Sequence, residues 1–376
     1  MLKLNPSGAN RWVPCPGSVQ MEAPFPRSET HPITEEGKAI HWAAEQVLIS
    51  WSPRNDFPAI ELRNLLGAKC PENGLIITDE FVEHATTYLE AVWRYVHTDL
   101  HAMLWEHKLS AFQWVQELSG RADLTWQSPD VTYAVVADGK FGYRPVSAFE
   151  NWQLVIYGMG MLRPETQTID LVIVQPRGRA IGNPVKVWRL DREQLLAYAD
   201  RVVEAAALAR GPNPPLRAGG HCYKCKAAAH CPALQAAGFA AMDASATATT
   251  VEIDERQIAW ELQLLRRAKE QLTAREDALE GLAIARIRAG SPVPGYAERR
   301  SLSNRSWTHG SPEETIAFGL LSGVDLATPA KPVTPQQAEV RGVPREMIDL
   351  FTERREGAAK LVCIDPDEAR KVFRNG

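Results

Sequence analysis

The sequence predicts an α/β fold in which helices flank a small central mixed sheet. Short runs rich in valine, isoleucine and tyrosine alternate with longer segments whose apolar residues recur at helical spacing. The strand-like runs cover residues 112–118, 120–127, 131–138, 169–175 and 185–190. The helical segments cover residues 35–50, 79–100, 149–162 and 191–209. Runs of the two kinds interleaved along one chain are typical of a sheet covered by helices.

The N-terminal half begins without a clear period. The first 30 residues are rich in proline, glycine and serine and are expected to be irregular. Thr34 is suited to cap the helix over 35–50, where His41 and Glu45 share one face. Residues 120–127 and 131–138 predict a hairpin with a tight turn at Ser128-Pro129-Asp130.

The rest of the chain divides into three parts by composition. A domain over 1–235 contains the sheet and a cysteine-rich segment, and the low-complexity stretch 236–251 is expected to be a linker. An extension over 252–376 begins with a long helix at about 252–289. Its apolar stripe indicates packing on the body of the protein or on a partner helix, and comprises Ile258, Leu262, Leu265, Leu272, Leu279 and Ile287.

Composition excludes several classes of protein. The 376 residues are 45% hydrophobic and 23% charged, as in ordinary globular proteins. No apolar run reaches the roughly 20 residues that cross a bilayer, and the N-terminus lacks the pattern of a secretory signal. A cytoplasmic protein without a membrane partner is therefore expected. A net charge of −4 argues against a basic nucleic-acid coat, although a local cleft can still be positive.

Two acids and a lysine stand out in the predicted hairpin. If Ser128 pairs with Val131, Asp123 lies opposite Val136, and Asp138 and Lys140 point to the same face. A register slip of one residue would separate them. Carboxylates are preferred ligands of Mg²⁺ and Mn²⁺, and a neighbouring lysine can stabilise charge that develops on a phosphate. By itself the D-x-K spacing occurs by chance in most proteins and favours solvated surface charges.

The order of motifs along the chain resembles the PD-(D/E)XK nuclease superfamily. It is similar to the branch of RecB-type exonucleases that carry an iron–sulfur cluster, and within it to a family of phage and prophage proteins. The resemblance extends to about residue 310. It rests on Asn5-Pro-Ser-Gly-Ala-Asn-Arg-Trp12, Cys15-Pro-Gly-Ser18, Glu36-Gly37 with His41, Gly120 with Asp123, Asp138-x-Lys140, Asn151-x-Gln153 with Tyr157, Gln175-Pro-Arg177, Cys222-x-x-Cys225 and Ser303-Asn-Arg-Ser-Trp307.

This resemblance implies a restriction-endonuclease-like core and a role for each site residue. His41, Asp123 and Asp138 would hold Mg²⁺ or Mn²⁺, and Lys140 would be the catalytic lysine. Gln153 and Tyr157 would contact the substrate backbone, although Tyr157 fits an ordinary core position as well. The chain departs from the pattern at Ala122, where the superfamily has its proline, and at Gly139, an unusual residue between the acid and the lysine.

The cysteines indicate a second metal site. Cys222, Cys225 and Cys231 have the spacing of metal ligands, since a cytosolic chain seldom forms disulfides. From composition alone the fourth ligand could be His221 or His230, which would make a zinc site. The resemblance instead implies Cys15 as the fourth ligand of a [4Fe–4S] cluster. Cys70 and Cys363 are expected to be ordinary small side chains.

These features together predict a metal-dependent DNA nuclease. The resemblance implies an exonuclease or end-processing enzyme of phage recombination or replication, located in the host cytoplasm. No phosphate-binding loop motif is present, so a helicase or recombination partner would be a separate protein. The alternatives are a non-catalytic DNA-binding or scaffold protein that keeps the cluster, and a zinc-stapled interaction module.

Overall fold

The structure is a computed structural model that forms two compact units, Met1–Arg275 and Glu276–Gly376. It describes residues 4–25, 32–50, 62–96, 103–177, 184–245, 255–302, 306–307, 312–326, 335, 338, 343–353 and 356–363. Among these residues, no helix is both long enough and apolar enough to cross a membrane.

A five-stranded sheet forms the centre of the first unit. Its strands follow chain order, β1-β2-β3-β4-β5. Only the β3–β4 pair is parallel, so the sheet is mixed as predicted. The strands are β1 (Met103–Ser110), β2 (Ser119–Gln127), β3 (Tyr133–Gly139), β4 (Thr168–Val174) and β5 (Val185–Asp191).

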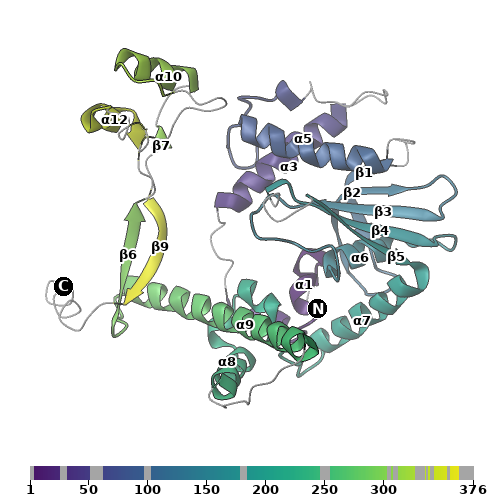
Figure 1. Cartoon of the computed structure of the whole chain (residues 1–376). Coiled ribbons are helices and arrows are strands. Elements are labelled where there is room, and N and C mark those ends of the chain that lie inside the picture. The colour runs from purple at the N-terminus through teal and green to yellow at the C-terminus, as the bar shows by residue number, and fades with distance from the viewer. Residues whose placement is uncertain are drawn as a thin grey trace. The chain divides into compact units, whose positions relative to one another are not determined.

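Helices cover both faces of this sheet (Figure 1). Helices α3 (Pro32–Ser50) and α5 (Asp79–Val96) lie on one face, and α6 (Trp152–Met161) and α7 (Arg192–Arg210) on the other. Alternation along the strands separates two apolar cores. In β3, Val136 packs in the core of α6 and α7, whereas its neighbours Val135 and Ala137 pack in the core of α3 and α5. The predicted α/β class is confirmed.

Side-chain caps fix the starts of two of these helices. Asp191 accepts a hydrogen bond from the backbone of Gln194 at 2.8 Å and forms a capping box that begins α7. Asn151 caps α6 in the same manner. The prediction that Thr34 caps a helix was wrong, because α3 already begins at Pro32, a residue suited to the first turn.

The segment before α3 is more regular than expected. Residues 4–25 form the short helices η1 (Pro6–Gly8), α1 (Ala9–Trp12) and α2 (Ser18–Glu22). Asn5 caps η1 by accepting from the Gly8 backbone at 2.7 Å, and the buried Trp12 indole donates to the Asn5 carbonyl at 2.9 Å. Proline and glycine here shape tight helical turns.

The prediction of a strand over 112–118 was also wrong. Residues 111–118 close a loop between β1 and β2, held by a hydrogen bond from the Ala111 backbone to the Leu118 carbonyl at 2.9 Å. Glu117 has a φ of 62°, outside the β region, and none of residues 111–118 pairs with a strand of the sheet. The first strand of the sheet is instead β1, eight residues earlier in the chain than expected.

The cysteine-rich segment folds into η4 (Gly220–Lys224) and η5 (Ala228–His230), followed by α8 (Pro232–Ser245). The first part of the expected linker, residues 236–245, is therefore helical. Its low complexity comes from alanine, which has the highest helix propensity of all residues. The long helix α9 spans Glu255–Arg288. Arg275 ties α9 to the cysteine segment by donating to the carbonyls of Ala228 and Ala229 at 3.0 and 2.7 Å.

Most apolar side chains of α9 are exposed in the described residues, among them Leu262, Leu265, Leu272 and Leu279. The second unit contains the strand pairs β6 (Tyr296–Leu302) with β9 (Glu356–Cys363) and β7 (Ser306–Trp307) with β8 (Thr352–Glu353). Its helices include α10 (Pro312–Leu321) and α12 (Arg345–Leu350). Residues 303–305 of the motif Ser303-Asn-Arg-Ser-Trp307 lie outside the described part of the chain.

Candidate functional site

The hairpin that bears the two acids pairs differently from the prediction. Gln127 pairs with Ala134, and the backbone of Ser128 donates to the Tyr133 carbonyl at 2.8 Å, so the turn is two residues longer. Asp123 therefore lies opposite Asp138 rather than Val136. The alternation of faces breaks at Asp123, since Leu124 packs in the core of α3 and α5 and Ala122 in that of α6 and α7. Asp123 nevertheless lies beside the end of β3, because the backbone of Gly139 donates to its Oδ2 at 2.8 Å.

A third carboxylate lies in the same row. The pairs Trp105–Leu124 and His107–Ala122 flank Glu106 and Asp123, which places these two residues opposite one another on β1 and β2. Glu106 also has a φ of 44°, a strained conformation of the kind that concentrates at functional sites. Glu106 was missed from the sequence because its strand was missed, and no motif marks it.

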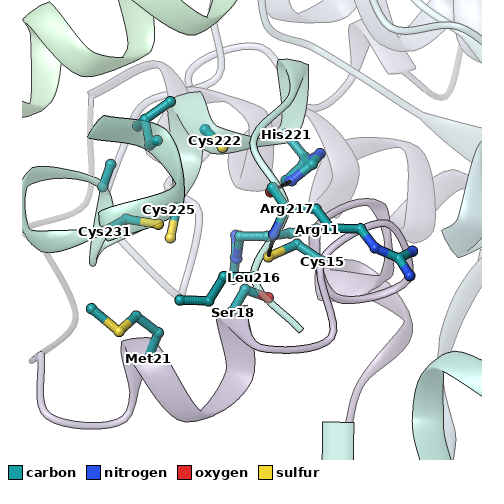
Figure 2. Close-up of a pocket in the computed structure, with 12 residues that line it drawn as sticks. Arg11, Cys15, Ser18, Met21, Leu216, Arg217, His221, Cys222, Cys225 and Cys231 are labelled. Carbon is teal, nitrogen blue, oxygen red and sulfur yellow. Dashed lines mark hydrogen bonds between the residues drawn. The ribbon is translucent and has the colours of Figure 1, made fainter. Parts of the chain in front are cut away.

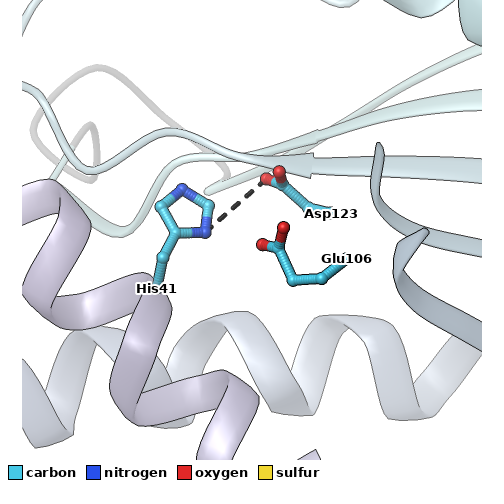
Figure 3. A group of neighbouring side chains, drawn as sticks. All are labelled: His41, Glu106 and Asp123. Atoms are coloured by element: carbon cyan, nitrogen blue, oxygen red, sulfur yellow. Dashed lines mark ion pairs between the residues drawn. The ribbon is translucent and has the colours of Figure 1, made fainter. Parts of the chain in front are cut away.

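Glu106, Asp123 and His41 form a compact group of possible metal ligands. One ligand atom from each lies within 4.8 Å of the others. Figure 3 shows the imidazole of α3 facing the two carboxylates from the sheet, with His41 Nδ1 3.7 Å from Asp123 Oδ2. The three side chains are 18–29% exposed, so a cation entering from solvent can reach them. The predicted ligands His41 and Asp123 thus lie together, joined by Glu106.

Gly139 accounts for the close approach of His41. A Cβ at this position would lie 3.1 Å from His41 Cε1 and 3.2 Å from Phe141 Cε2, tighter than ordinary contacts. The backbone N–H of Gly139 also donates to Asp123 Oδ2 at 2.8 Å, which fixes that carboxylate. The glycine between the acid and the lysine is therefore explained by packing.

Asp138 and Lys140 form a pair beside this group. The Lys140 ammonium contacts Asp138 Oδ2, and Gln153 of α6 donates to Asp138 Oδ1 at 2.9 Å. Lys140 also donates to Gln153 Oε1 at 3.3 Å. Asp138 is 1% exposed, whereas the Lys140 side chain is 30% exposed. Gln153 thus holds both members of the pair, and the lysine is the member that faces solvent.

Burial and mutual repulsion shift the ionisation of these groups. Burial raises the pKa of Asp138 to about 6, assisted by Asp123 and opposed by Lys140. Burial likewise raises the pKa of Glu106 to about 7, again assisted by Asp123. Burial disfavours the Lys140 ammonium, but the carboxylates of Asp138 and Asp123 outweigh it and raise the pKa of that lysine. Asp123 raises the pKa of both neighbouring carboxyl groups, and a bound cation would relieve this repulsion between the acids.

Two tyrosines surround the carboxylates. Tyr157 is 3% exposed and donates to the Arg121 carbonyl at 2.6 Å; burial raises its pKa to about 12. Tyr88 on α5 is 2% exposed, and its hydroxyl has no hydrogen-bond partner among the described residues. Burial, then Asp123 and Asp138, raise the pKa of Tyr88 well above its usual range. Tyr88 lies in the helix predicted over 79–100 and was not predicted as a site residue, but it lies near both acids.

Two further motif residues hold the loop that follows β3. The Gln175 side chain is fully buried and donates to the carbonyls of Gly142 and Arg144 at 2.8 and 2.7 Å. Arg177 pairs with Glu36 of α3 at 2.6 Å and with Glu80 of α5 at 3.1 Å. These contacts fix the loop and both helices relative to the site.

The carboxylate row suits a hard divalent cation. Mg²⁺ and Mn²⁺ prefer carboxylate oxygens, which two of the three ligands supply. The raised carboxyl pKa values fit such an ion, because neighbouring acids repel one another until a cation neutralises them. Glu106, Asp123 and His41 would hold the ion, with Asp138 next in the row.

The four predicted cysteine ligands line one pocket (Figure 2). Cys15 reaches it from the N-terminal segment, and Cys222, Cys225 and Cys231 come from the η4–η5 segment. Gly17 makes this approach possible, because a Cβ there would lie 2.8 Å from the Pro214 carbonyl oxygen. His221 lines the same pocket, but its Nε2 lies 2.9 Å from the Arg217 carbonyl; His230 does not line it.

The surroundings of these sulfurs suit thiolates bound to a metal. The backbones of Arg217 and Gly219 donate to the sulfurs of Cys15 and Cys222 at 3.3 and 3.4 Å. Burial raises the pKa of Cys15 and of Cys222, and that of Cys225 to about 12, so the thiols are neutral unless a metal displaces their protons. Within the described residues no three of the sulfurs lie within 4.8 Å of one another.

One comparison places the chain among known sequences. A family model described as "Protein of unknown function (DUF2800)" matches residues 2–363, nearly the whole chain. The match extends over the hairpin, the cysteine segment and the second unit alike.

Proposed function

The chain belongs to the DUF2800 family, and we propose that it is a metal-dependent deoxyribonuclease of the PD-(D/E)XK type. The observation that carries the proposal is the row Glu106, Asp123 and Asp138 on three adjacent strands, with His41 on one side and Lys140 on the other. Hard ligands beside a charged lysine are the elements that phosphodiester hydrolysis requires.

A divalent ion bound at this row would neutralise charge on the phosphate and lower the pKa of water. Lys140 stays charged beside Asp138 and is exposed on one side, so its ammonium can donate to a phosphate oxygen as negative charge develops there. Gln153 keeps that ammonium in place through its own oxygen. Hydrolysis adds water across the bond: an oxygen–phosphorus bond forms, the opposite one breaks, and the leaving oxygen takes up a proton.

We also propose that the cysteine pocket holds a [4Fe–4S] cluster. The four sulfurs in one pocket and the backbone donors to two of them support this assignment. Thiolates around a single zinc with bonds of about 2.3 Å would lie roughly 3.8 Å apart, whereas no three of the sulfurs lie within 4.8 Å of one another among the described residues; this supports a cluster over a single zinc ion. Such a cluster would join Cys15 to a segment about two hundred residues away and stabilise the fold.

An exonuclease or end-processing role in phage recombination or replication, alongside a separate helicase or recombination protein, is part of the proposal. The alternative is a DNA-binding scaffold that keeps the cluster and cuts nothing. End-labelled DNA incubated with the purified protein and Mn²⁺ or Mg²⁺ separates the two. Shortened products that disappear with chelator support the nuclease, whereas DNA that is bound and left intact with either metal supports the scaffold.

A further inference from the structure

A cleft lies next to the carboxylate row of Glu106, Asp123 and Asp138, on the side where Lys140 contacts Asp138. Lys140 and Gln153 line one end, and Arg144, Tyr223 and Lys224 line the part near the cysteine segment. The cleft has a volume of about 590 Å³ and is open to solvent. It therefore connects the proposed catalytic lysine to the loop that contains Cys222.

The charge of this cleft is opposite to that of the chain as a whole. Four basic side chains line it, Arg11, Lys140, Arg144 and Lys224, against one acid, Glu150. Arg11 pairs with Glu22 at 2.8 Å, Lys140 with Asp138, and Glu150 with Arg201 at 3.4 Å, so Arg144 and Lys224 carry the excess positive charge. Neither Arg144 nor Lys224 pairs with an acid among the described residues, although the net charge of the whole chain is −4. A basic lining of this kind attracts phosphates.

An aromatic ring lies close to both unpaired cations. Tyr223 is 39% exposed, the Arg144 guanidinium carbon lies 3.3 Å from its ring centroid, and the Lys224 ammonium lies 5.4 Å from it. A ring face that stacks on a planar guanidinium has the shape and surface to stack on a nucleobase. Aromatic faces alternating with basic groups in a groove are the recurring means of binding a single strand.

Both walls of the cleft are held rigidly. Gln175 fixes the loop that contains Arg144, through the carbonyl of that residue at 2.7 Å. In the cysteine segment, Arg11 donates to the Lys224 carbonyl at 3.4 Å, and Cys222 immediately precedes Tyr223 in η4. A preformed cleft loses less conformational freedom when a strand enters it.

We propose that this cleft binds one strand of DNA, with Tyr223 stacked on a base and with Arg144 and Lys224 on phosphates, and directs that strand to Lys140. The inference rests on the proposed function for the identity of the nucleic acid and for the direction of the strand. It adds that the substrate entering the site is single-stranded. A duplex cannot stack a base on Tyr223 without first unpairing it.

Binding measured without cleavage tests this inference separately. Fluorescein-labelled oligothymidine is titrated with the full chain in chelator, and a hairpin duplex of equal length is titrated in parallel. Wild type should bind the single strand more tightly, and Tyr223→Ala should weaken that binding about 5- to 150-fold, the range for loss of one stacked base. Tyr223→Phe should bind as wild type, and Lys224→Ala should reduce the slope of log affinity against log salt by about 0.7.

Tyr143→Ala is the matched control. This tyrosine is 57% exposed, lies on the same loop as Arg144 and does not line the cleft. It should bind as wild type. The inference is overturned if Tyr223→Ala binds within twofold of wild type, if Tyr143→Ala weakens binding as much, or if the duplex binds more tightly than the strand. Equal melting temperatures of the tyrosine variants exclude unfolding as the cause. A protein that cuts no DNA but shows this binding pattern would refute the nuclease and leave the cleft assignment standing.

Discussion

Without metal, the Glu106→Gln variant should be more stable than wild type. With bound Mn²⁺, it should be less stable than wild type. The substitution keeps the shape of the side chain and removes its charge. In the folded protein burial raises the pKa of Glu106 from 4.5 to about 7, with repulsion from Asp123 next in size. Between these two values the unfolded chain has released its proton and the folded chain has kept it, so stability falls as pH rises.

The size of this effect follows from the shift in pKa. A change from 4.5 to about 7 at about 1.4 kcal/mol per pKa unit corresponds to a loss of about 3 kcal/mol, complete above pH 7. Because glutamine does not ionise, the Glu106→Gln variant does not lose this stability as pH rises. In chelator at pH 8 the variant should therefore melt about 6–12 °C above wild type, at roughly 2–4 °C per kcal/mol for a unit of this size.

Added Mn²⁺ should reverse the order. The ion must displace the proton of Glu106, so wild-type affinity should fall about tenfold for each pH unit below 7. Glutamine offers a weaker, uncharged oxygen, so Mn²⁺ should raise the variant's melting temperature much less than that of wild type. His41, Asp123 and Asp138 are present in both proteins. The difference between their Mn²⁺-induced rises in melting temperature therefore measures the contribution of Glu106 to Mn²⁺ binding.

Differential scanning calorimetry at pH 5, 6, 7 and 8, with chelator or with Mn²⁺, measures both halves of the prediction. Glu90→Gln, an exposed glutamate on α5, is the control and should follow wild type throughout. The reasoning is refuted if Glu106→Gln is no more stable than wild type in chelator at pH 8, or if Mn²⁺ stabilises both equally.

Three further substitutions test other parts of the site. Lys140→Ala should lower DNA turnover about 100- to 1,000-fold while oligonucleotide affinity in chelator changes little, because the lysine acts on developing charge; a parallel loss in both would make it a simple phosphate contact. Gly139→Ala should weaken Mn²⁺ binding about tenfold in calorimetric titration, because its Cβ would displace His41, and unchanged affinity would contradict this. Cys15→Ala should lose iron and thermal stability together in protein purified without air, whereas Cys70→Ala should keep its iron; iron retained at full occupancy in Cys15→Ala would remove Cys15 from the cluster.

The sheet was predictable where alternation was strong. Strands β3 and β4 were found because their valines and isoleucines are buried on both faces. Strand β5 alternates between exposed and less exposed residues, which also marks a strand. Strand β1 was missed because its sequence, with Glu106, His107 and Lys108 in the middle, lacks such a run. The loop at 111–118 was mistaken for it, since apolar residues there pack into the core without pairing.

Part of the site could be derived from the hairpin and part could not. Asp123, Asp138 and Lys140 belong to one hairpin, so they lie near one another even with the wrong turn length. Glu106 comes from a strand whose pairing depends on the fold, and Tyr88 from a helix that crosses the sheet. Side chains brought together by long-range packing leave no periodic trace in the sequence.

The most direct test of the central claim is the initial rate at which the protein releases nucleotides from end-labelled DNA in Mn²⁺. Wild type should be active, chelator should abolish the activity, and Asp138→Asn should lose it. Asp200→Asn, an exposed aspartate on α7, should retain the wild-type rate. Digestion by Asp138→Asn at the wild-type rate, or an intact wild-type reaction in chelator, would contradict the assignment of the carboxylate row as a metal-dependent catalytic centre.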